Sequence, residues 1–234
     1  MRHDPAAIWA HTNKVLHFLK EQNPGLTTLH VVSDGPTTQY RSKKNFFLLS
    51  TLPFEMGWTK VTWNFMEAGH GKGPADGVGA AVKQKADRMV AMGKDISSPK
   101  TLFNELLASK TNIKLFFIEN EEIDAIDALL PDDLQTVRGT MTIHQIVSES
   151  PGVISWSILS CFCSSPNGCS CFDPQVVTFQ KDDRLPSHKA HQHSTTHQPM
   201  CCSALKNILM SNPHNEIDKL GHSMHFDVSC TQTL

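Results

Sequence analysis

Several features that would assign this 234-residue sequence to a particular class of protein are missing. No run of about 18 apolar residues is present, and a membrane-spanning helix needs at least that length. The N-terminus, MRHDPAAIWAH, lacks the apolar core of a secretory signal, and no internal repeat occurs. From these absences we expect a soluble protein of the nucleus or cytoplasm that is not secreted and has no membrane partner.

The sequence also has little net charge. The formal value is -2 at pH 7, so the chain as a whole does not attract nucleic acid. Locally, however, the stretch from Arg41 to Lys100 holds ten basic and five acidic residues, whereas Glu119 to Glu149 holds eight acidic residues and one arginine. A basic middle beside an acidic flank is compatible with a polyanionic partner such as DNA without requiring one.

The cysteines are odd in number and unevenly placed. Four of the seven lie within eleven residues, as Cys161-x-Cys163 and, after five residues, Cys169-x-Cys171. This crowding argues against a secreted disulfide framework and favours reduced or metal-bound thiols. Four thiolates joined by a Pro-Asn-Gly turn can close a tetrahedral site, so the sequence predicts structural Zn²⁺. The one-residue gaps differ from the usual two-residue gaps, and buried unligated cysteines or adventitious disulfides are the alternatives.

Turn residues and apolar periodicity predict alternating helices and strands. We expect helices at 4–23, 40–51, 75–92, just after 99 and at 121–130, and strands at 27–33, 58–66, 113–119, 140–147 and 153–159. This order predicts a layered α/β core over residues 1–130. The last two strands form a β-hairpin that leads into the cysteines, over 131–180, and the aromatic-poor segment 181–234 is expected to be mostly disordered.

The stretch "WNFMEAGHGKGPADGVGAAVK" places a glycine-rich loop between a strand and a helix. A Walker loop needs Ser or Thr after its Gly-Lys, but Gly73 follows Lys72, and Pro74 occupies the third glycine position of a dinucleotide fingerprint. Gly-x-Ser-x-Gly elbows are absent as well. A loop that offers backbone amides, His70 and Lys72 to a phosphate at a helix N-terminus remains one reading. A simple glycine-rich connection, capped by His70, is the other.

Two acids flank this part of the chain. Asp34 ends the strand 27–33, and Asp76 lies at the start of the helix that follows the strand 58–66. The strand-helix-strand order predicts that the two strands are parallel neighbours. Both carboxylates then lie at the same end of the sheet, where they can hold Mg²⁺ or Mn²⁺ for phosphoryl chemistry. The alternatives are an ordinary Asp-Gly-Pro turn and an acid that gains about 0.3–1 kcal/mol from the helix dipole.

The segments "SDGPTTQYRSKKNFFLL" and "WNFMEAGHGKGPADGVGAAVK" resemble a group of uncharacterised animal proteins that look like derivatives of DNA transposons. Their core is similar to the ribonuclease H-like fold of transposases and integrases. The resemblance covers roughly residues 27–90 and extends through "PGVISWSILSCFC". It implies that Asp34 and Asp76 occupy catalytic metal-binding positions, with His70 and Lys72 near the scissile phosphate.

The chain departs from that fold in one respect: it starts with a helix, whereas a ribonuclease H-like core starts with a three-stranded meander that carries the first catalytic acid. The resemblance therefore implies the C-terminal half of such a domain, without catalytic activity. It also implies an open sheet edge that invites self-association. Weak DNA binding is expected from His70, Lys72, Arg41, Lys43, Lys44, Lys83 and Lys85. The alternative is a zinc-stabilised module that binds nucleic acid or protein and retains no enzymatic function.

Overall fold

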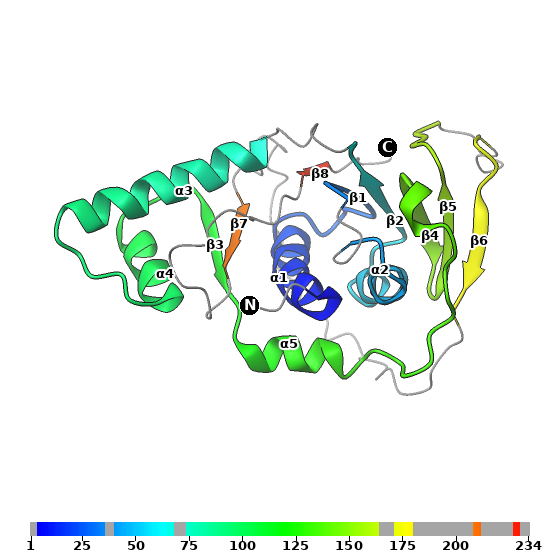
Figure 1. The fold of residues 1–234 in the computed structure, drawn as a ribbon, viewed down its shortest axis with the longest axis horizontal. Coiled ribbons are helices and arrows are strands. Elements are labelled where there is room, and N and C mark those ends of the chain that lie inside the picture. The colour runs from blue at the N-terminus through cyan, green and yellow to red at the C-terminus, as the bar shows by residue number, and fades with distance from the viewer. Residues whose placement is uncertain are drawn as a thin grey trace.

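A computed structural model describes residues 4–35, 40–67, 74–163, 171–179, 208–211 and 227–229. The chain forms a mixed α/β fold in which helices cover one face of a twisted sheet (Figure 1). The elements in chain order are α1 (Pro5–Gln22), β1 (Thr28–Ser33), α2 (Lys43–Glu55), β2 (Lys60–Phe65), α3 (Pro74–Ala91), α4 (Pro99–Ala108), β3 (Lys114–Phe117), α5 (Asn120–Asp127), η1 (Thr140–Thr142), β4 (Gln145–Ser150), β5 (Val153–Ser157), β6 (Gln175–Thr178), β7 (Ile208–Ser211) and β8 (Asp227–Ser229).

Capping residues explain where three helices begin. The side chains of Asp4, Ser42 and Ser98 each accept a hydrogen bond from the backbone N–H three residues later. Such caps satisfy backbone donors that have no partner inside the helix. Pro5 and Pro99 occupy the first turns of α1 and α4, where a missing N–H costs nothing. The cap at Ser42 also explains why α2 begins three residues later than the sequence predicts.

The main sheet has the strand order β6-β5-β4-β2-β1-β8. Strands β1 and β2 are adjacent and parallel, in register from Thr28↔Lys60 to Ser33↔Phe65, which confirms the predicted neighbourhood of these two strands. Strand β4 pairs antiparallel with β2, and β8 pairs antiparallel with β1. Strands β4, β5 and β6 form an antiparallel meander. Each strand of the parallel pair therefore has a second neighbouring strand, and the edges of the sheet are β6 and β8.

The core lies between this sheet and the helices α1 and α2. Alternate residues of β1 and β2 are buried, and Leu29, Val31 and Trp63 among them are at most 1% exposed and belong to one apolar cluster with both helices. The ring of Trp9 on α1 meets that of Trp63 edge-on, with centroids 6.0 Å apart. Ile146 of β4 belongs to the same cluster. The hairpin expected as a separate segment is thus continuous with the sheet and core of residues 1–130.

Helices α3 and α4 lie apart from α1 and α2, at the left of the molecule (Figure 1). Their buried residues, with neighbouring side chains from β3, form a second, smaller cluster around Val82, Ala86 and Met89. These three, with Val78, are the apolar face that the sequence predicts for α3, and all are buried. Strand β3 pairs with β7 in a separate two-stranded sheet.

Two predicted segments differ in extent from those that the structure describes. The strand predicted at 140–147 begins only at Gln145, because Gly139 adopts a φ of 71° and a 3-10 turn follows it at Thr140–Thr142. Strands β7 and β8 lie inside the segment predicted to be mostly disordered, and the rest of 181–234 is outside the described residues. In the part of the chain that the structure describes, no helix is long and apolar enough to cross a membrane.

Candidate metal centre

The face of the sheet opposite α1 and α2 carries polar side chains. His30 and Thr62 are register partners on β1 and β2, and His30 Nδ1 lies 2.8 Å from Thr62 Oγ1. Asn64, Gln145 and Ser157 form a row across β2, β4 and β5. Asn64 and Gln145 are at most 5% exposed, although none of the helices that the structure describes packs on this face. Another segment of the chain must therefore cover them.

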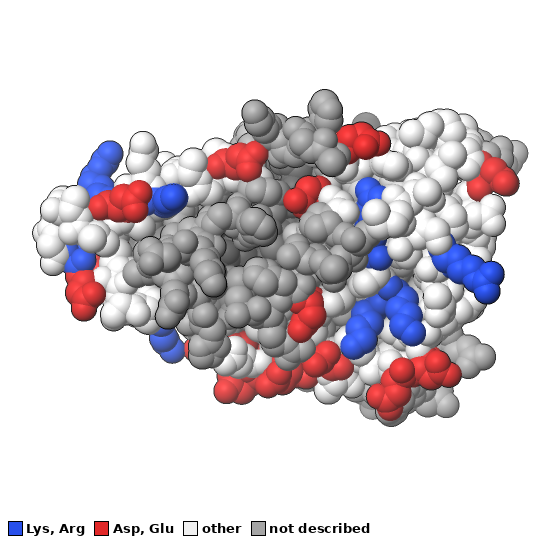
Figure 2. Space-filling model, viewed as in Figure 1, with Lys and Arg blue, Asp and Glu red and all other residues white. Residues whose placement is uncertain are grey.

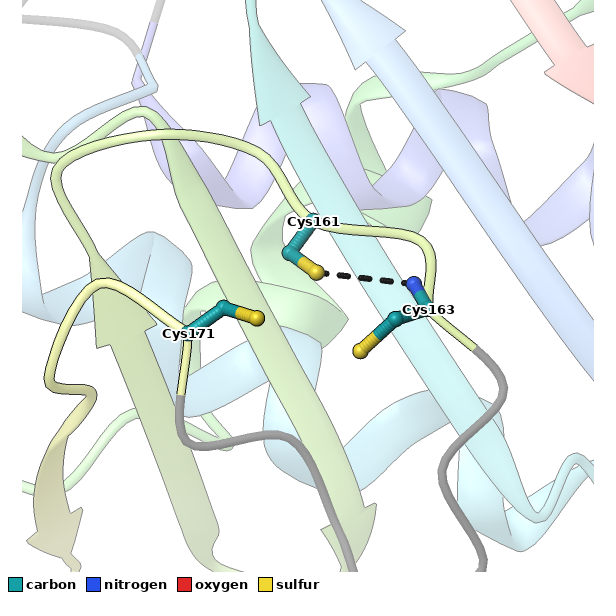
Figure 3. Close-up of side chains that lie close together, drawn as sticks. All are labelled: Cys161, Cys163 and Cys171. Carbon is teal, nitrogen blue, oxygen red and sulfur yellow. Dashed lines mark hydrogen bonds between the residues drawn. The ribbon is translucent and has the colours of Figure 1, made fainter.

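That cover is the segment 158–163, which leaves β5 and crosses the polar face (Figure 3). Ser160 Oγ donates to the carbonyl of His144 at the start of β4, over 3.3 Å. At the far end, the ring of Phe162 meets the ring of His30 on β1, with centroids 5.6 Å apart. The segment thus runs from β5 across β4 and β2 to β1. It carries Cys161 and Cys163 over the middle of the sheet.

Gln145 fixes the backbone of Cys161. Its Nε2 donates to the carbonyl of Cys161 over 2.9 Å, and its Oε1 accepts from the Cys161 N–H over 3.1 Å. Nε2 also donates to Oδ1 of Asn64 over 2.9 Å. Asn64 in turn donates to the carbonyl of Val31 over 3.2 Å. A buried chain of hydrogen bonds therefore links the backbone of β1 to the first cysteine.

Three cysteine sulfurs converge at this place. The Sγ atoms of Cys161, Cys163 and Cys171 all lie within 4.8 Å of one another, and Figure 3 shows them facing a common space. Zn–S bonds of about 2.3 Å in a tetrahedral site place sulfurs roughly 3.8 Å apart. The arrangement therefore needs only a small contraction around an ion. The fourth predicted ligand, Cys169, lies outside the described residues.

The first two cysteines are also in direct contact. The backbone N–H of Cys163 donates to Sγ of Cys161 over 3.4 Å. Thiolate sulfur is a soft ligand that suits zinc and related ions. Cys161 and Cys163 lie on the outgoing limb of the β5–β6 connection, and Cys171 lies on the returning limb. One ion bound to all three would cross-link the two limbs.

The acids beside the glycine-rich loop do not form a comparable cluster in the described residues. Asp34 follows β1 directly and Asp76 lies in the first turn of α3, and both are exposed. Burial, together with the charge of Asp34, raises the pKa of Tyr40 above its usual range. Within the described ranges, neither acid belongs to a group of three metal-ligating side chains. The predicted phosphate contacts His70 and Lys72 lie outside the described residues.

Arg41 is not a surface residue. It is 9% exposed, its guanidinium donates to the carbonyl of Met141, and it lies over the ring of Phe65 at 5.0 Å. Gly35 lies close alongside, since a Cβ there would be 2.6 Å from Nη2 of Arg41. This burial argues against the predicted contact of Arg41 with nucleic acid. Arg41 is buried because its aliphatic chain and planar guanidinium fill space at the end of β1 and β2.

The other predicted cations that the structure describes lie on two separate helices, α2 and α3. Lys43 donates to the carbonyl of residue 134 over 2.8 Å, and Lys85 donates to that of residue 109 over 3.3 Å. Lys44 and Lys83 are exposed but lie on α2 and α3, in different parts of the molecule. Figure 2 shows basic side chains right of centre, over α2, and acidic ones along the lower edge, over α5. The described residues form no continuous basic face in that view.

Sequence reasoning did not single out Gln145, Asn64 or His30. The one available indication was the alternation in β2, where polar Thr62 and Asn64 stand between apolar Val61, Trp63 and Phe65. Such alternation indicates a strand with one polar face. It does not show that a later segment returns to cover that face.

Comparison with known proteins identifies a family for most of the chain. Residues 1–160 match the family model described as "Domain of unknown function (DUF8701)". No curated protein and no solved structure matches the chain. The matched region includes α1 to β5 and ends one residue before Cys161. Because the match spans well over half of the 234 residues, the chain belongs to the DUF8701 family.

Proposed function

We propose that this protein is a non-catalytic binding module whose β5–β6 connection is held in shape by structural zinc. The observation that carries the proposal is the convergence of the Cys161, Cys163 and Cys171 sulfurs from two limbs of one loop. Cys169, two residues before Cys171, supplies the fourth thiolate in this proposal. Zinc sites closed by four protein ligands are structural, whereas catalytic sites keep one position for water or substrate.

The loop presents apolar side chains to solvent. Ile158, Leu159, Phe162, Phe172 and Val176 are between 44% and 68% exposed, and all lie in or next to the segment 158–176 that contains the cysteines. Large apolar groups exposed along one short segment are typical of a surface that binds another macromolecule. Because the segment 158–176 contains no lysine or arginine, a protein partner fits it better than nucleic acid does.

Zinc content of the purified, reduced protein tests the proposal. We expect about one zinc per chain, and Cys163→Ser is expected to lose most of it together with the order of the loop, because structural zinc contributes folding free energy directly. Ser155→Ala, a change on the neighbouring strand β5, is the matched control and keeps its zinc. Absence of zinc from the wild-type protein, or full zinc in Cys163→Ser, would overturn the proposal.

A second candidate function follows from the β1–β2 pair. The strands are parallel neighbours, Asp34 follows the first, and Asp76 opens the helix after the second. This order supports a relationship to metal-dependent DNA strand-transfer enzymes with a ribonuclease H-like core. In this proposal the two acids are remnants of a Mg²⁺ or Mn²⁺ site and the chain is catalytically inactive, because within the described residues neither acid belongs to a group of three metal-ligating side chains. Weak DNA binding is the activity that remains.

We also propose that the chain associates with itself through a sheet edge. Strand β6 is the last strand on its side of the sheet, and its Val176 is 68% exposed. Exposed strand edges pair readily with other chains. Pairing of β6 between two copies would extend the sheet. Concentration-dependent mass measurement by light scattering tests this: Val176→Lys is expected to shift the population to monomer, and a monomer at all concentrations in the wild type would contradict it.

A further inference from the structure

Gln145 joins the buried sheet to the cysteine cluster, and we infer that it is a positioning residue that sets the affinity of the metal site. The inference rests on the proposed function, since it concerns the same site. The side chain of Gln145 is 3% exposed, so its amide group must find its partners inside the protein. Those partners are Asn64 on one side and the backbone of Cys161 on the other.

The hydrogen-bond chain fixes the orientation of the Gln145 amide. The carbonyl of Val31 can only accept, so the group that Asn64 turns toward it is the donor Nδ2. Oδ1 of Asn64 then faces Gln145 and requires a donor, which is Nε2. Oε1 of Gln145 is thereby left to face the N–H of Cys161. A flipped Gln145 amide would place oxygen against both Oδ1 of Asn64 and the carbonyl of Cys161.

Gln145 therefore acts toward Cys161 as a neighbouring strand would. It accepts from the N–H and donates to the carbonyl of the same residue, over 3.1 Å and 2.9 Å. The backbone of Cys161 is held at both ends, which leaves mainly the side-chain torsion to place its sulfur. The N–H of Cys163 is directed at that sulfur. A ligand held in its bound position before the metal arrives loses less conformational freedom on binding, and affinity rises accordingly.

A residue that only stabilises the hairpin should not change the affinity for the metal. The backbone of Gln145 also pairs with β2 and β5, so any change at this residue affects the hairpin to some extent. Ser148 offers a matched comparison on the same strand. It is 1% exposed, and its Oγ donates to the carbonyl of Val153 over 2.7 Å. Ser148→Ala removes a buried hydrogen bond of the hairpin and leaves the contacts of Cys161 in place.

Cobalt titration of the reduced, metal-free full chain tests the inference. Co²⁺ bound by thiolates gives charge-transfer absorption that reports both affinity and the number of sulfur ligands. We expect Gln145→Met, which keeps the length of the side chain and removes its hydrogen bonds, to weaken Co²⁺ and Zn²⁺ binding by about 10- to 100-fold, as changes around metal ligands typically do. Ser148→Ala is expected to bind as the wild type does, and urea unfolding of the metal-free variants measures their stabilities.

The outcomes separate the inference from the proposed function. Failure of the wild-type protein to bind either ion would overturn the proposed function. Binding by Gln145→Met that equals the wild type, or an equal loss in Ser148→Ala, would overturn the role of Gln145 while the zinc site stands. Amide hydrogen exchange in the metal-free wild type needs no variant. We expect the N–H of Cys161 to be protected by Oε1 of Gln145, and exchange at the rate of an unstructured chain would refute the inference.

Discussion

The indole N–H of Trp9 donates to Oδ1 of Asn45 over 2.7 Å and joins α1 to α2 inside the core. Asn45 is 0% exposed, and its Nδ2 donates to the carbonyl of Tyr40 over 2.7 Å. A single amide side chain thus satisfies a buried tryptophan and the backbone at the start of α2. This arrangement fixes the two helices that cover the sheet.

Asn45→Ala is expected to destabilise the protein substantially. It leaves the N–H of Trp9 and the carbonyl of Tyr40 without their partner, and each buried group left unsatisfied costs about 1–3 kcal/mol. Urea unfolding followed by tryptophan fluorescence measures the change. Lys44→Ala, an exposed change on the same helix, is the control and should stay within about 0.5 kcal/mol of the wild type. An Asn45→Ala variant as stable as this control would contradict the account of the core.

His30 is expected to make the stability of the metal-free protein depend on pH. Burial, and then the charge of Lys60, lower the pKa of His30. The folded protein therefore takes up a proton at a lower pH than the unfolded chain does. The stabilising contribution is present above the unfolded pKa of about 6.5 and decreases as the pH falls below it. Unfolding free energies at pH 7.5, 6.0 and 5.0 test this. His30→Gln should have a flatter profile, and equal slopes would refute the prediction.

No metal-dependent cleavage or joining of DNA is expected. Asp34 and Asp76 are exposed acids without a third ligand in the described residues, and phosphoryl transfer depends on charges placed closely around the reacting phosphate. Labelled DNA is incubated with the protein in the presence of Mg²⁺ or Mn²⁺, alongside Asp76→Ala. Cleavage that requires metal and disappears in Asp76→Ala would show a working active site and reverse this conclusion.

Any DNA binding should depend on Lys44 and Lys83 more than on Arg41. The two lysines are exposed, whereas Arg41 is buried against Phe65. Each lost phosphate contact reduces the slope of log affinity against log salt by about 1. Fluorescence anisotropy over a range of salt concentrations is the measurement, with the double variant Lys44→Ala, Lys83→Ala compared with the wild type. An unchanged slope would exclude these residues from the contact.

Local patterns predicted much of the fold, because capping and periodicity act over a few residues. Asp4-Pro5 marked the start of α1, and the apolar spacing of Val78 to Met89 marked the buried face of α3. The parallel neighbourhood of β1 and β2 followed from the strand-helix-strand order. The extent of β4 was harder to predict, because the 3-10 turn depends on the positive φ of Gly139 as well as on composition.

The candidate site was predictable only in its ligands. Cysteine spacing indicated Cys161, Cys163 and Cys171, because the sequence shows both the residue type of possible ligands and their separation along the chain. The support of Cys161 by Gln145, sixteen residues earlier, depends on which face of the sheet the segment 158–163 crosses. The burial of Arg41 likewise depends on Met141, one hundred residues later. Interactions of this range have no local sequence pattern.

X-ray absorption at the zinc edge of the reduced, zinc-loaded protein identifies the atoms that bind the ion. If zinc holds the two limbs of the β5–β6 connection together through cysteine sulfur, the ion should have a shell of sulfur ligands at about 2.3 Å. Cys171→Ser, which removes the ligand on the returning limb, should replace one sulfur by a lighter atom or abolish binding. A zinc shell made of nitrogen and oxygen, or a spectrum unchanged by Cys171→Ser, would contradict the account.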